Sequence, residues 1–173
     1  MKYFNLRIAS VALMIMMGVT SFAHDFEVKN DDGVSIFYKR LTDNKLAVTY
    51  CGNNYKNYAS YKGNVVIPKT VLYNNIEYSV TAIGDYAFYG CSNLRAINIP
   101  DSLTSIGDYA FYNCNSLDSV IVSDLAAWCS VKIGNNTLFP DHHLYIGENK
   151  EITDLAIPDG VTTIRSLDRK SVV

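Results

Sequence analysis

Residues 83–94 read IGDYAFYGCSNL, and residues 106–117 read IGDYAFYNCNSL. Ile83 and Ile106 open the two segments, and nine of their twelve positions are identical. A fixed period of this length is typical of a solenoid, because one unit cannot bury its apolar face without a stacked neighbour. The repeat therefore predicts a stack of coils, each of about 23 residues.

The repeated unit has two parts with different expected structures. Its later part follows the pattern L-x-x-I-x-I, the strand signature of a leucine-rich repeat, so we expect short strands that pair in parallel. Its earlier part, Asp85–Phe88, is expected to form a single helical turn with Asp85 as N-cap. We expect the apolar repeat positions to form the core, namely Ile83, Ala87, Phe88, Cys91, Leu94, Ile97, Ile99, Ile106, Ala110, Phe111, Cys114, Leu117, Val120, Val122, Ile152, Leu155 and Ile157.

Together the two parts read I-G-x-x-A-F-x-x-C-x-x-L-x-x-I-x-I-P, with the next isoleucine six positions after the proline. This pattern resembles the BspA-like leucine-rich repeat of bacterial surface proteins, of the Bacteroides type. The resemblance covers roughly residues 26–164. It implies a leucine-rich-repeat solenoid and a secreted or cell-surface protein that adheres to host matrix or to other bacteria.

The repeat is interrupted once. The interval from Ile99 to Ile157 is not a whole multiple of the interval from Ile83 to Ile106, so residues 123–150 are expected to form an irregular insert. A short helix is expected from Asp124 to Trp128. The single tryptophan should plug the enlarged coil, with stacking on a sugar ring as the alternative.

Residues 24–61 precede the repeats, which are expected to span residues 62–164. Alternating apolar residues on either side of a turn at 42–45 predict a β-hairpin that caps the solenoid, since a bare end coil would expose its apolar floor and an unpaired strand edge. Val65 begins a weaker first copy of the repeat. A tight turn at 73–76 then predicts a second hairpin, because asparagine tolerates positive φ.

Residues 1–23 are expected to be a signal peptide. Lys2 and Arg7 precede an uncharged apolar run at residues 8–19, and small residues stand just before His24, the expected mature N-terminus. The alternative is a membrane anchor, but the run is too short to span a bilayer comfortably. We therefore expect export to the cell surface or medium, without a stable transmembrane span after cleavage.

Charge also limits the class of partner. The chain has 15 basic and 17 acidic residues. Cleavage would remove two of the basic ones and none of the acidic ones, leaving 13 against 17 and a net charge of −4. A mildly acidic chain without a basic cluster is not expected to bind nucleic acid.

The C-terminal residues 165–173 depart from the repeat. After Ile164 the pattern requires Gly-x-x-Ala-Phe, but the sequence continues Arg165-Ser166-Leu167. We therefore expect a C-terminally truncated solenoid whose last segment, 165–173, is an artefactual, non-repeat tail.

Catalytic motifs are lacking, so we expect neither an enzyme nor a cofactor. The sequence contains no serine elbow, P-loop or HExxH motif. His142 and His143 beside Asp141 could suggest a metal, but adjacent residues on an extended chain point to opposite faces, and no spaced ligand set supports them. Cys129 would need a positioned base to act as a nucleophile.

The four cysteines, Cys51, Cys91, Cys114 and Cys129, allow two interpretations. Cys91 and Cys114 hold the same repeat position, so stacking could bring them within reach of a disulfide in an oxidising compartment. Alternatively, they form a ladder of buried thiols that pack as small apolar groups. The family resemblance implies the second interpretation.

Two repeating surfaces are candidates for binding an extracellular protein or a glycan. Tyrosine offers a large, rigid contact area with a polar tip, so the preferred surface consists of Tyr86, Tyr89, Tyr109 and Tyr112. The alternative is the outward side of the strands, formed by Arg95, Ala96, Asn98, Asp118, Ser119 and Ile121. The tyrosines could instead only stack on one another and shield the turns. At the level of function, adhesion competes with a structural spacer and with a glycan-binding accessory module of a larger secreted protein.

Overall fold

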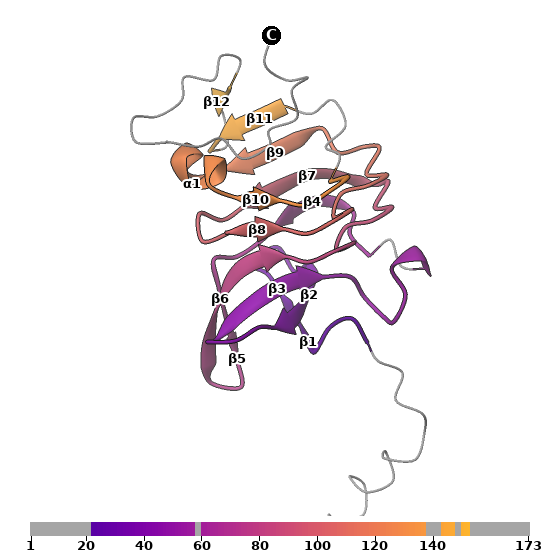
Figure 1. Ribbon diagram of the computed structural model, residues 1–173, viewed down its shortest axis with the longest axis vertical. Coiled ribbons are helices and arrows are strands. Elements are labelled where there is room, and N and C mark those ends of the chain that lie inside the picture. The colour runs from indigo at the N-terminus through magenta and orange to yellow at the C-terminus, as the bar shows by residue number, and fades with distance from the viewer. Residues whose placement is uncertain (1–21, 58–59, 138–142, 148–149, 153–173) are drawn as a thin grey trace, which may run out of the picture.

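The computed structural model describes residues 22–57, 60–137, 143–147 and 150–152, which wind into a stack of coils with strands at successive levels (Figure 1). Two sheets run along the stack. Sheet A contains β1 (Phe26–Lys29), β2 (Ser35–Arg40), β3 (Lys45–Thr49), β6 (Ile76–Ile83), β8 (Ser105–Ile106) and β10 (Lys132–Ile133) in this order, with β5 (Thr70–Tyr73) paired to β6. Sheet B contains β4 (Gly63–Val66), β7 (Leu94–Ile99), β9 (Ser119–Val122), β11 (His143–Ile146) and β12 (Lys150–Glu151) in this order.

The repeat positions lie above one another in both sheets. In sheet A, β6 and β8 pair in parallel with Ile83 opposite Ile106. In sheet B, Ile97 of β7 lies between Val65 of β4 and Val120 of β9, again in parallel. The predicted parallel strands and the weaker first copy are therefore confirmed.

The apolar repeat positions from residue 83 to residue 122 are all buried. Phe88 and Phe111, at equivalent positions of two coils, stack with ring centroids 4.9 Å apart. Neighbouring coils thus share one core, as a solenoid requires. Ile152 is half-buried, while Leu155 and Ile157 lie outside the described residues.

Three strands cap the N-terminal end, one more than the expected hairpin. β2 and β3 pair antiparallel as predicted, with Asp43 and Asn44 at positive φ in their turn. The added strand, β1, pairs with the outer edge of β2. Because β3 pairs in parallel with β6, the cap also supplies the first rung of sheet A.

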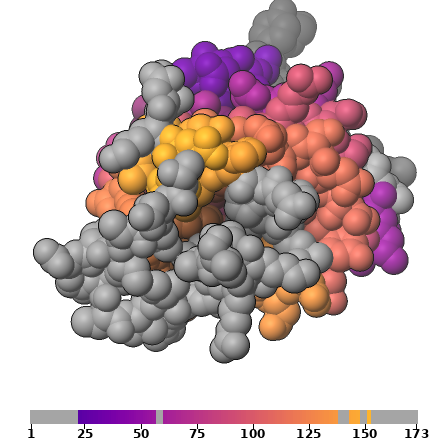
Figure 2. Space-filling model, turned by 90° about the horizontal axis from the view of Figure 1, so that it is seen from above, coloured from indigo at the N-terminus to yellow at the C-terminus, as the bar shows by residue number. Residues whose placement is uncertain are grey.

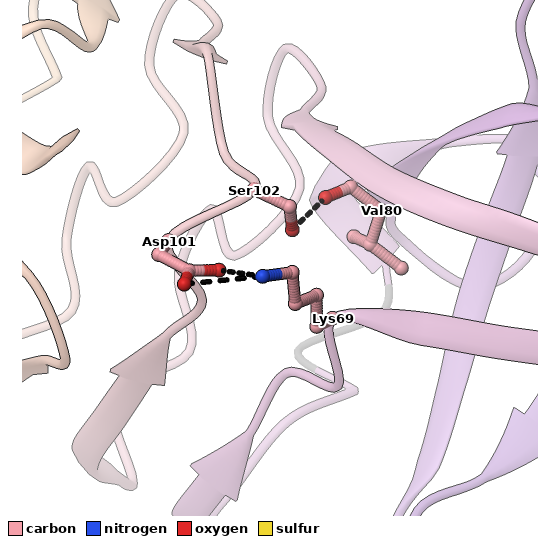
Figure 3. A network of polar contacts seen from close by, with 4 residues as sticks. All are labelled: Lys69, Val80, Asp101 and Ser102. Atoms are coloured by element: carbon pink, nitrogen blue, oxygen red, sulfur yellow. Dashed lines mark hydrogen bonds and ion pairs between the residues drawn. The ribbon is translucent and has the colours of Figure 1, made fainter.

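The second predicted hairpin is confirmed as β5 and β6. Asn74 and Asn75 both have positive φ, at 52° and 61°, which matches the right-handed twist of a two-residue hairpin. An ion pair joins the start of this hairpin to the next coil: Lys69 Nζ lies 2.8 Å from a carboxylate oxygen of Asp101 (Figure 3). The next residue, Ser102, donates its hydroxyl hydrogen to the Val80 carbonyl at 2.7 Å (Figure 3).

The described part of residues 123–150, the segment expected to be an irregular insert, continues both sheets. β10 pairs in parallel with β8, placing Ile133 beside Ile106, and β11 pairs in parallel with β9, placing Leu144 beside Val120. Figure 2, viewed along the stack, shows β11 and β12 in yellow beside the orange residues of the coil before them. The period fails here because the interval from Ile106 to Ile133 is longer than the interval between the two preceding repeats.

The helix α1 (Leu125–Cys129) accommodates the added length of this coil, in the place where the sequence predicts a short helix. Asp124 is its N-cap, because the carboxylate accepts hydrogen bonds from the amides of Ala126 at 2.8 Å and Ala127 at 3.1 Å. Trp128 is only 5% exposed. The tryptophan therefore plugs the coil as expected, and its ring offers no open face for a sugar.

Candidate interaction surfaces

The chain between sheet A and sheet B forms what we call the turn face, which comprises residues 84–93, 107–116 and 134–136. The expected helical turn is absent from it. Tyr86 and Tyr109 adopt left-handed φ angles of 59° and 55°, which a right-handed helix excludes. Four-residue hydrogen-bonded turns occur instead, for example one closed by the bond from the Tyr89 amide to the Tyr86 carbonyl at 3.0 Å.

Asp85 caps the next coil, and not its own turn as predicted. Its Oδ1 accepts a hydrogen bond from the amide of Asp108, at the equivalent position of that coil, at 2.8 Å. Asp108 repeats the contact by accepting from the Asn135 amide at 2.6 Å. Backbone bonds also link the coils, since the Phe88 amide donates to the Ala110 carbonyl at 2.8 Å. The turn face is therefore a third hydrogen-bonded ladder along the stack.

This ladder explains the glycine of the repeated I-G-D. A Cβ placed on Gly107 would collide with Asp85 Oδ1 and would lie 2.8 Å from the carbonyl carbon of Gly84. The same holds one coil later, where a Cβ on Gly134 would meet Asp108 Oδ1 at 2.5 Å. The aspartate of each coil thus occupies the space that a Cβ would need at the glycine of the next coil.

The four tyrosines of the preferred surface form two columns. Tyr86 stacks on Tyr109 with centroids 5.3 Å apart and planes within 4°, and Tyr89 stacks on Tyr112 at 5.5 Å and 14°. Tyr55, in the 3₁₀ helix Tyr55–Asn57, extends the first column by stacking on Tyr86 at 4.0 Å. Tyr55 could not be found from the repeat pattern because it lies outside the repeat, although the tyrosine-rich stretch before residue 61 is a signal for it.

The left-handed tyrosines are not explained by backbone preference. A bulky residue at positive φ is an outlier, whereas asparagine tolerates this region. The equivalent residue of the next coil is Asn136, with φ of 49°. Because the same backbone position accepts asparagine there, stacking is the gain that offsets the strain at Tyr86 and Tyr109.

The tyrosine columns are half-buried. Loss of solvent raises the pKa of Tyr86, and the nearby Tyr55 and Tyr109 phenols raise it further. Within each column, one ring covers the face of the next. A partner would therefore reach mainly ring edges and hydroxyl groups.

The outward side of β4, β7, β9 and β11, which we call the sheet B face, is arranged differently. A hollow crosses these four strands. It is lined by Asn64, Arg95, Ala96, Ser116, Asp118, Ser119, Ile121 and Tyr145. The hollow contains five of the six residues of the alternative surface, all except Asn98, and adds three residues that sequence reasoning missed.

Register explains how the hollow is assembled. Asn64, Ala96, Ser119 and His143 stand side by side on successive strands. Outward residues such as these repeat at the inter-strand spacing of about 4.8 Å. Tyr145 was missed because its strand, β11, lies in the segment expected to be irregular.

The two charged side chains of the hollow, Arg95 and Asp118, do not pair with each other. The Arg95 guanidinium forms no ion pair with any of the described residues, although the Asp118 amide donates a hydrogen bond to the Arg95 carbonyl. The Asp118 carboxylate instead accepts the hydroxyl hydrogen of Ser119 at 2.9 Å. The sheet B face therefore offers both a cation and an anion to a partner.

None of the four cysteines forms a disulfide. Cys91 and Cys114 lie in the core as the thiol ladder predicts, and Cys114 Sγ donates to the Phe88 carbonyl at 3.0 Å. Burial raises the pKa of Cys114 to about 12. Burial also raises the pKa of Cys129, so the thiolate that nucleophilic catalysis needs is disfavoured at neutral pH.

Two further sequence observations concern histidine and the membrane. His143 pairs through Nδ1 with the Glu151 carboxylate across β11 and β12, while His142 lies outside the described residues. No cluster of three or more potential metal ligands occurs in the part of the chain that the structure describes. Within that same part, no helix has the length and apolar character needed to cross a membrane.

Several solved bacterial structures are similar to part of this chain. Solved structures similar to this chain include a leucine rich cell surface protein from Faecalibacterium prausnitzii, with 30% identity, a TM-score of 0.48 and coverage of 65% of this chain. Leucine-rich repeat proteins from Bacteroides ovatus and Bacteroides capillosus are each 23% identical, with TM-scores of 0.46 and 0.43 and coverage of 82% and 70% of this chain. The chain covers 27%, 37% and 99% of these three structures respectively. A search of curated proteins gives no match.

The parallel ladders and the I-G-D turns define a leucine-rich-repeat solenoid. The family described as BspA type leucine rich repeat region matches residues 68–166 in six copies. Because the match covers more than half of the 173 residues, the chain belongs to this family. Proteins of this family are generally surface or protein-interaction proteins.

Proposed function

We propose that the protein is an exported, non-catalytic adhesion module that binds another extracellular protein through the sheet B face. The observation that supports this best is the hollow across four strands, whose charged groups are not paired with each other. Buried or stacked side chains already contact other residues of the chain, whereas the Arg95 side chain has no ion-pair partner among the described residues. A partner can therefore gain hydrogen bonds at Arg95 without first breaking an ion pair within the described part of the chain.

Repetition along the stack favours an extended protein partner. Successive strands present equivalent outward positions at intervals of about 4.8 Å. A partner segment laid across the strands would contact several coils at once, so individually weak contacts would act together. The net charge of −4 expected for the exported chain gives little long-range steering, so salt should alter binding only mildly.

The tyrosine columns on the turn face are a second candidate surface. Their hydroxyl-bearing edges are half-exposed and repeat along the stack. Tyrosine is also enriched at protein interfaces. We rank this surface second because the ring faces are occupied by the stacking that the structure shows.

Export forms part of the proposal and rests on the N-terminal sequence, since residues 1–21 lie outside the described ones. The test is N-terminal sequencing of protein recovered from the native host. We expect the mature chain to begin at or near His24. Recovery of the soluble protein with Met1 intact would overturn export by this route.

Binding is tested by surface plasmon resonance of the chain against a panel of purified extracellular-matrix proteins, with a glycan array in parallel. Ser119→Tyr combined with Ile121→Tyr fills the hollow from two outward positions of β9 without changing its charge. Ser105→Tyr introduces the same side chain on β8 of sheet A and serves as control. We expect a matrix protein that binds the wild type and the control but loses at least tenfold affinity for the filled variant.

Two outcomes would overturn the proposal. Equal binding by the wild type and the filled variant would exclude the sheet B face. Binding to glycans with no binding to any protein of the panel would favour the glycan-binding alternative. Circular dichroism of both variants must show the wild-type spectrum, so that a loss of binding reports on the surface.

A further inference from the structure

We infer that the sheet B face selects partner segments that carry a carboxylate side chain, and that Arg95 is the group that binds it. The inference rests on the proposed function, because it names the chemistry of the partner at the same hollow. The occupant would be an extended peptide segment with an aspartate or glutamate, lying across β4, β7 and β9.

Arg95 has no ion-pair partner among the described residues. Its main-chain carbonyl accepts a hydrogen bond from the Asp118 amide at 2.9 Å, so the two backbones are held side by side. Despite this proximity, the two side chains form no ion pair, and the Asp118 carboxylate accepts the hydroxyl hydrogen of Ser119 instead. The guanidinium keeps its fork of donors available, and that fork matches a carboxylate in two parallel hydrogen bonds.

The composition of the hollow also favours a carboxylate at Arg95. Arg95 is the only lysine or arginine among the eight lining residues. Asn64 of β4 stands opposite Ala96, the residue after Arg95, and its side-chain amide can donate a further hydrogen bond. A carboxylate placed between Arg95 and Asn64 would thus meet donors from two coils.

The position of Asp118 gives the partner segment a direction. Asp118, one coil further along, repels a carboxylate and attracts a donor group. The acidic residue should therefore lie toward β4, and a hydroxyl, amide or basic group should lie over β9. Beyond it, Ile121 and Tyr145 offer an apolar contact and a phenol for the next partner residue.

The test uses a displayed library of random linear peptides of about twelve residues, a length that can span several strands. The library is selected on the wild-type chain in the presence of excess Ser119→Tyr, Ile121→Tyr variant, so that only binders of the sheet B face are retained. We expect aspartate or glutamate to be enriched at one position. Changing that residue to its amide should weaken binding about tenfold, as for a charge-assisted hydrogen bond in a partly covered site.

Variants of the chain then assign the effect to Arg95. Arg95→Gln should bind the acidic peptide and its amide equally, whereas Arg95→Lys should retain part of the preference. Lys132→Gln, which removes the same charge from β10 in sheet A, should behave as the wild type. This control separates a contact at Arg95 from a change in net charge.

Two kinds of result would overturn the inference. Retained peptides without an acidic preference, or an unchanged preference in Arg95→Gln, overturn the role of Arg95 while leaving the sheet B face as a binding surface. If the filled variant competes away every selected peptide, both the proposed surface and this inference are overturned.

Discussion

The turn face and the sheet B face repeat with the same coils, but their polar side chains differ in whether they bond to the neighbouring coil. On the turn face, Asp85 and Asp108 each accept an amide of the next coil, and the tyrosine rings stack. On the sheet B face, Arg95 and Asp118 lie side by side without pairing. Repetition alone therefore does not mark a binding surface, and the side chains left without internal partners are the better guide.

The difference follows from the backbone. In sheet B, parallel pairing satisfies the main-chain amides and carbonyls, so the backbone does not need the outward side chains as hydrogen-bond partners. The turn face contains left-handed residues and single turns, so its amides need acceptors from elsewhere. Aspartate carboxylates and carbonyls of the adjacent coil supply them. Side chains on the turn face thus maintain the fold, and those on the sheet B face remain available to a partner.

The largest expected effect is on the core beneath the turn face. Phe111 is fully buried against Phe88, so Phe111→Ala should lower the free energy of unfolding by about 3–5 kcal/mol. Ile121→Ala on the sheet B face should cost less than about 1 kcal/mol, because its side chain is only half-buried. Urea denaturation followed by circular dichroism measures both. Similar losses for the two variants would mean that the faces do not differ in this way.

The next effect tests the close approach between coils. Gly107→Ala should lower the free energy of unfolding by about 3 kcal/mol, because the added Cβ would collide with backbone and carboxylate atoms of the preceding coil. Gly90→Ala is the matched control. Gly90 has positive φ but no atom within 4 Å of an added Cβ, so only left-handed strain of about 1 kcal/mol is expected. If the control is the more destabilised of the two in urea, the coils are not in contact at Gly107.

Much of this architecture could be predicted from the sequence where local chemistry decides it. The spacing of Ile83 and Ile106 predicted the stacked register, and Asn74-Asn75 predicted the hairpin turn, because asparagine is suited to positive φ. The left-handed Tyr86 could not be predicted in this way. Tyrosine is disfavoured there, so local preference indicated a right-handed turn, while the compensating ring belongs to Tyr109 in the next coil.

The same limit applies to the other errors. Asp85 was correctly taken for a carboxylate that caps amides, but its amide belongs to the next coil. β10 is very short and follows a longer coil, so neither hydrophobic pattern nor period revealed it. For the candidate site, sequence alternation identified the outward residues of β7 and β9. It could not show that Arg95 and Asp118 avoid each other, because that depends on side-chain conformation.

A smaller effect is expected from the aspartate ladder. Asp108→Ala removes the acceptor of the Asn135 amide, and water can replace only part of it, so we expect a loss of about 1 kcal/mol. Asp118→Ala removes the same group from the sheet B face, where it accepts only the neighbouring Ser119 hydroxyl, and should change stability by less than about 0.5 kcal/mol. Parallel thermal melts of the two variants check the difference. Equal melting temperatures would contradict the division of tasks between the faces.

The smallest net effect is expected where two contributions oppose each other. Tyr109→Asn removes ring stacking, worth about 0.5–1.5 kcal/mol, but relieves left-handed strain of similar size at φ of 55°. Asn136 already occupies the equivalent position of the next coil, so the backbone accepts the change. Tyr112→Asn is the control, because Tyr112 stacks on Tyr89 without a positive φ, and urea denaturation should show it to be the more destabilised variant.

Binding by these two folded variants then separates the two surfaces. If a matrix-protein partner binds the sheet B face, both tyrosine variants should retain wild-type affinity, and Arg95→Gln should not. If Tyr109→Asn keeps its stability and loses the partner while Arg95→Gln retains it, then tyrosine is kept at a strained position for recognition. In that case the turn face is the binding surface, and the stacking serves to hold the phenol edges in place for the partner.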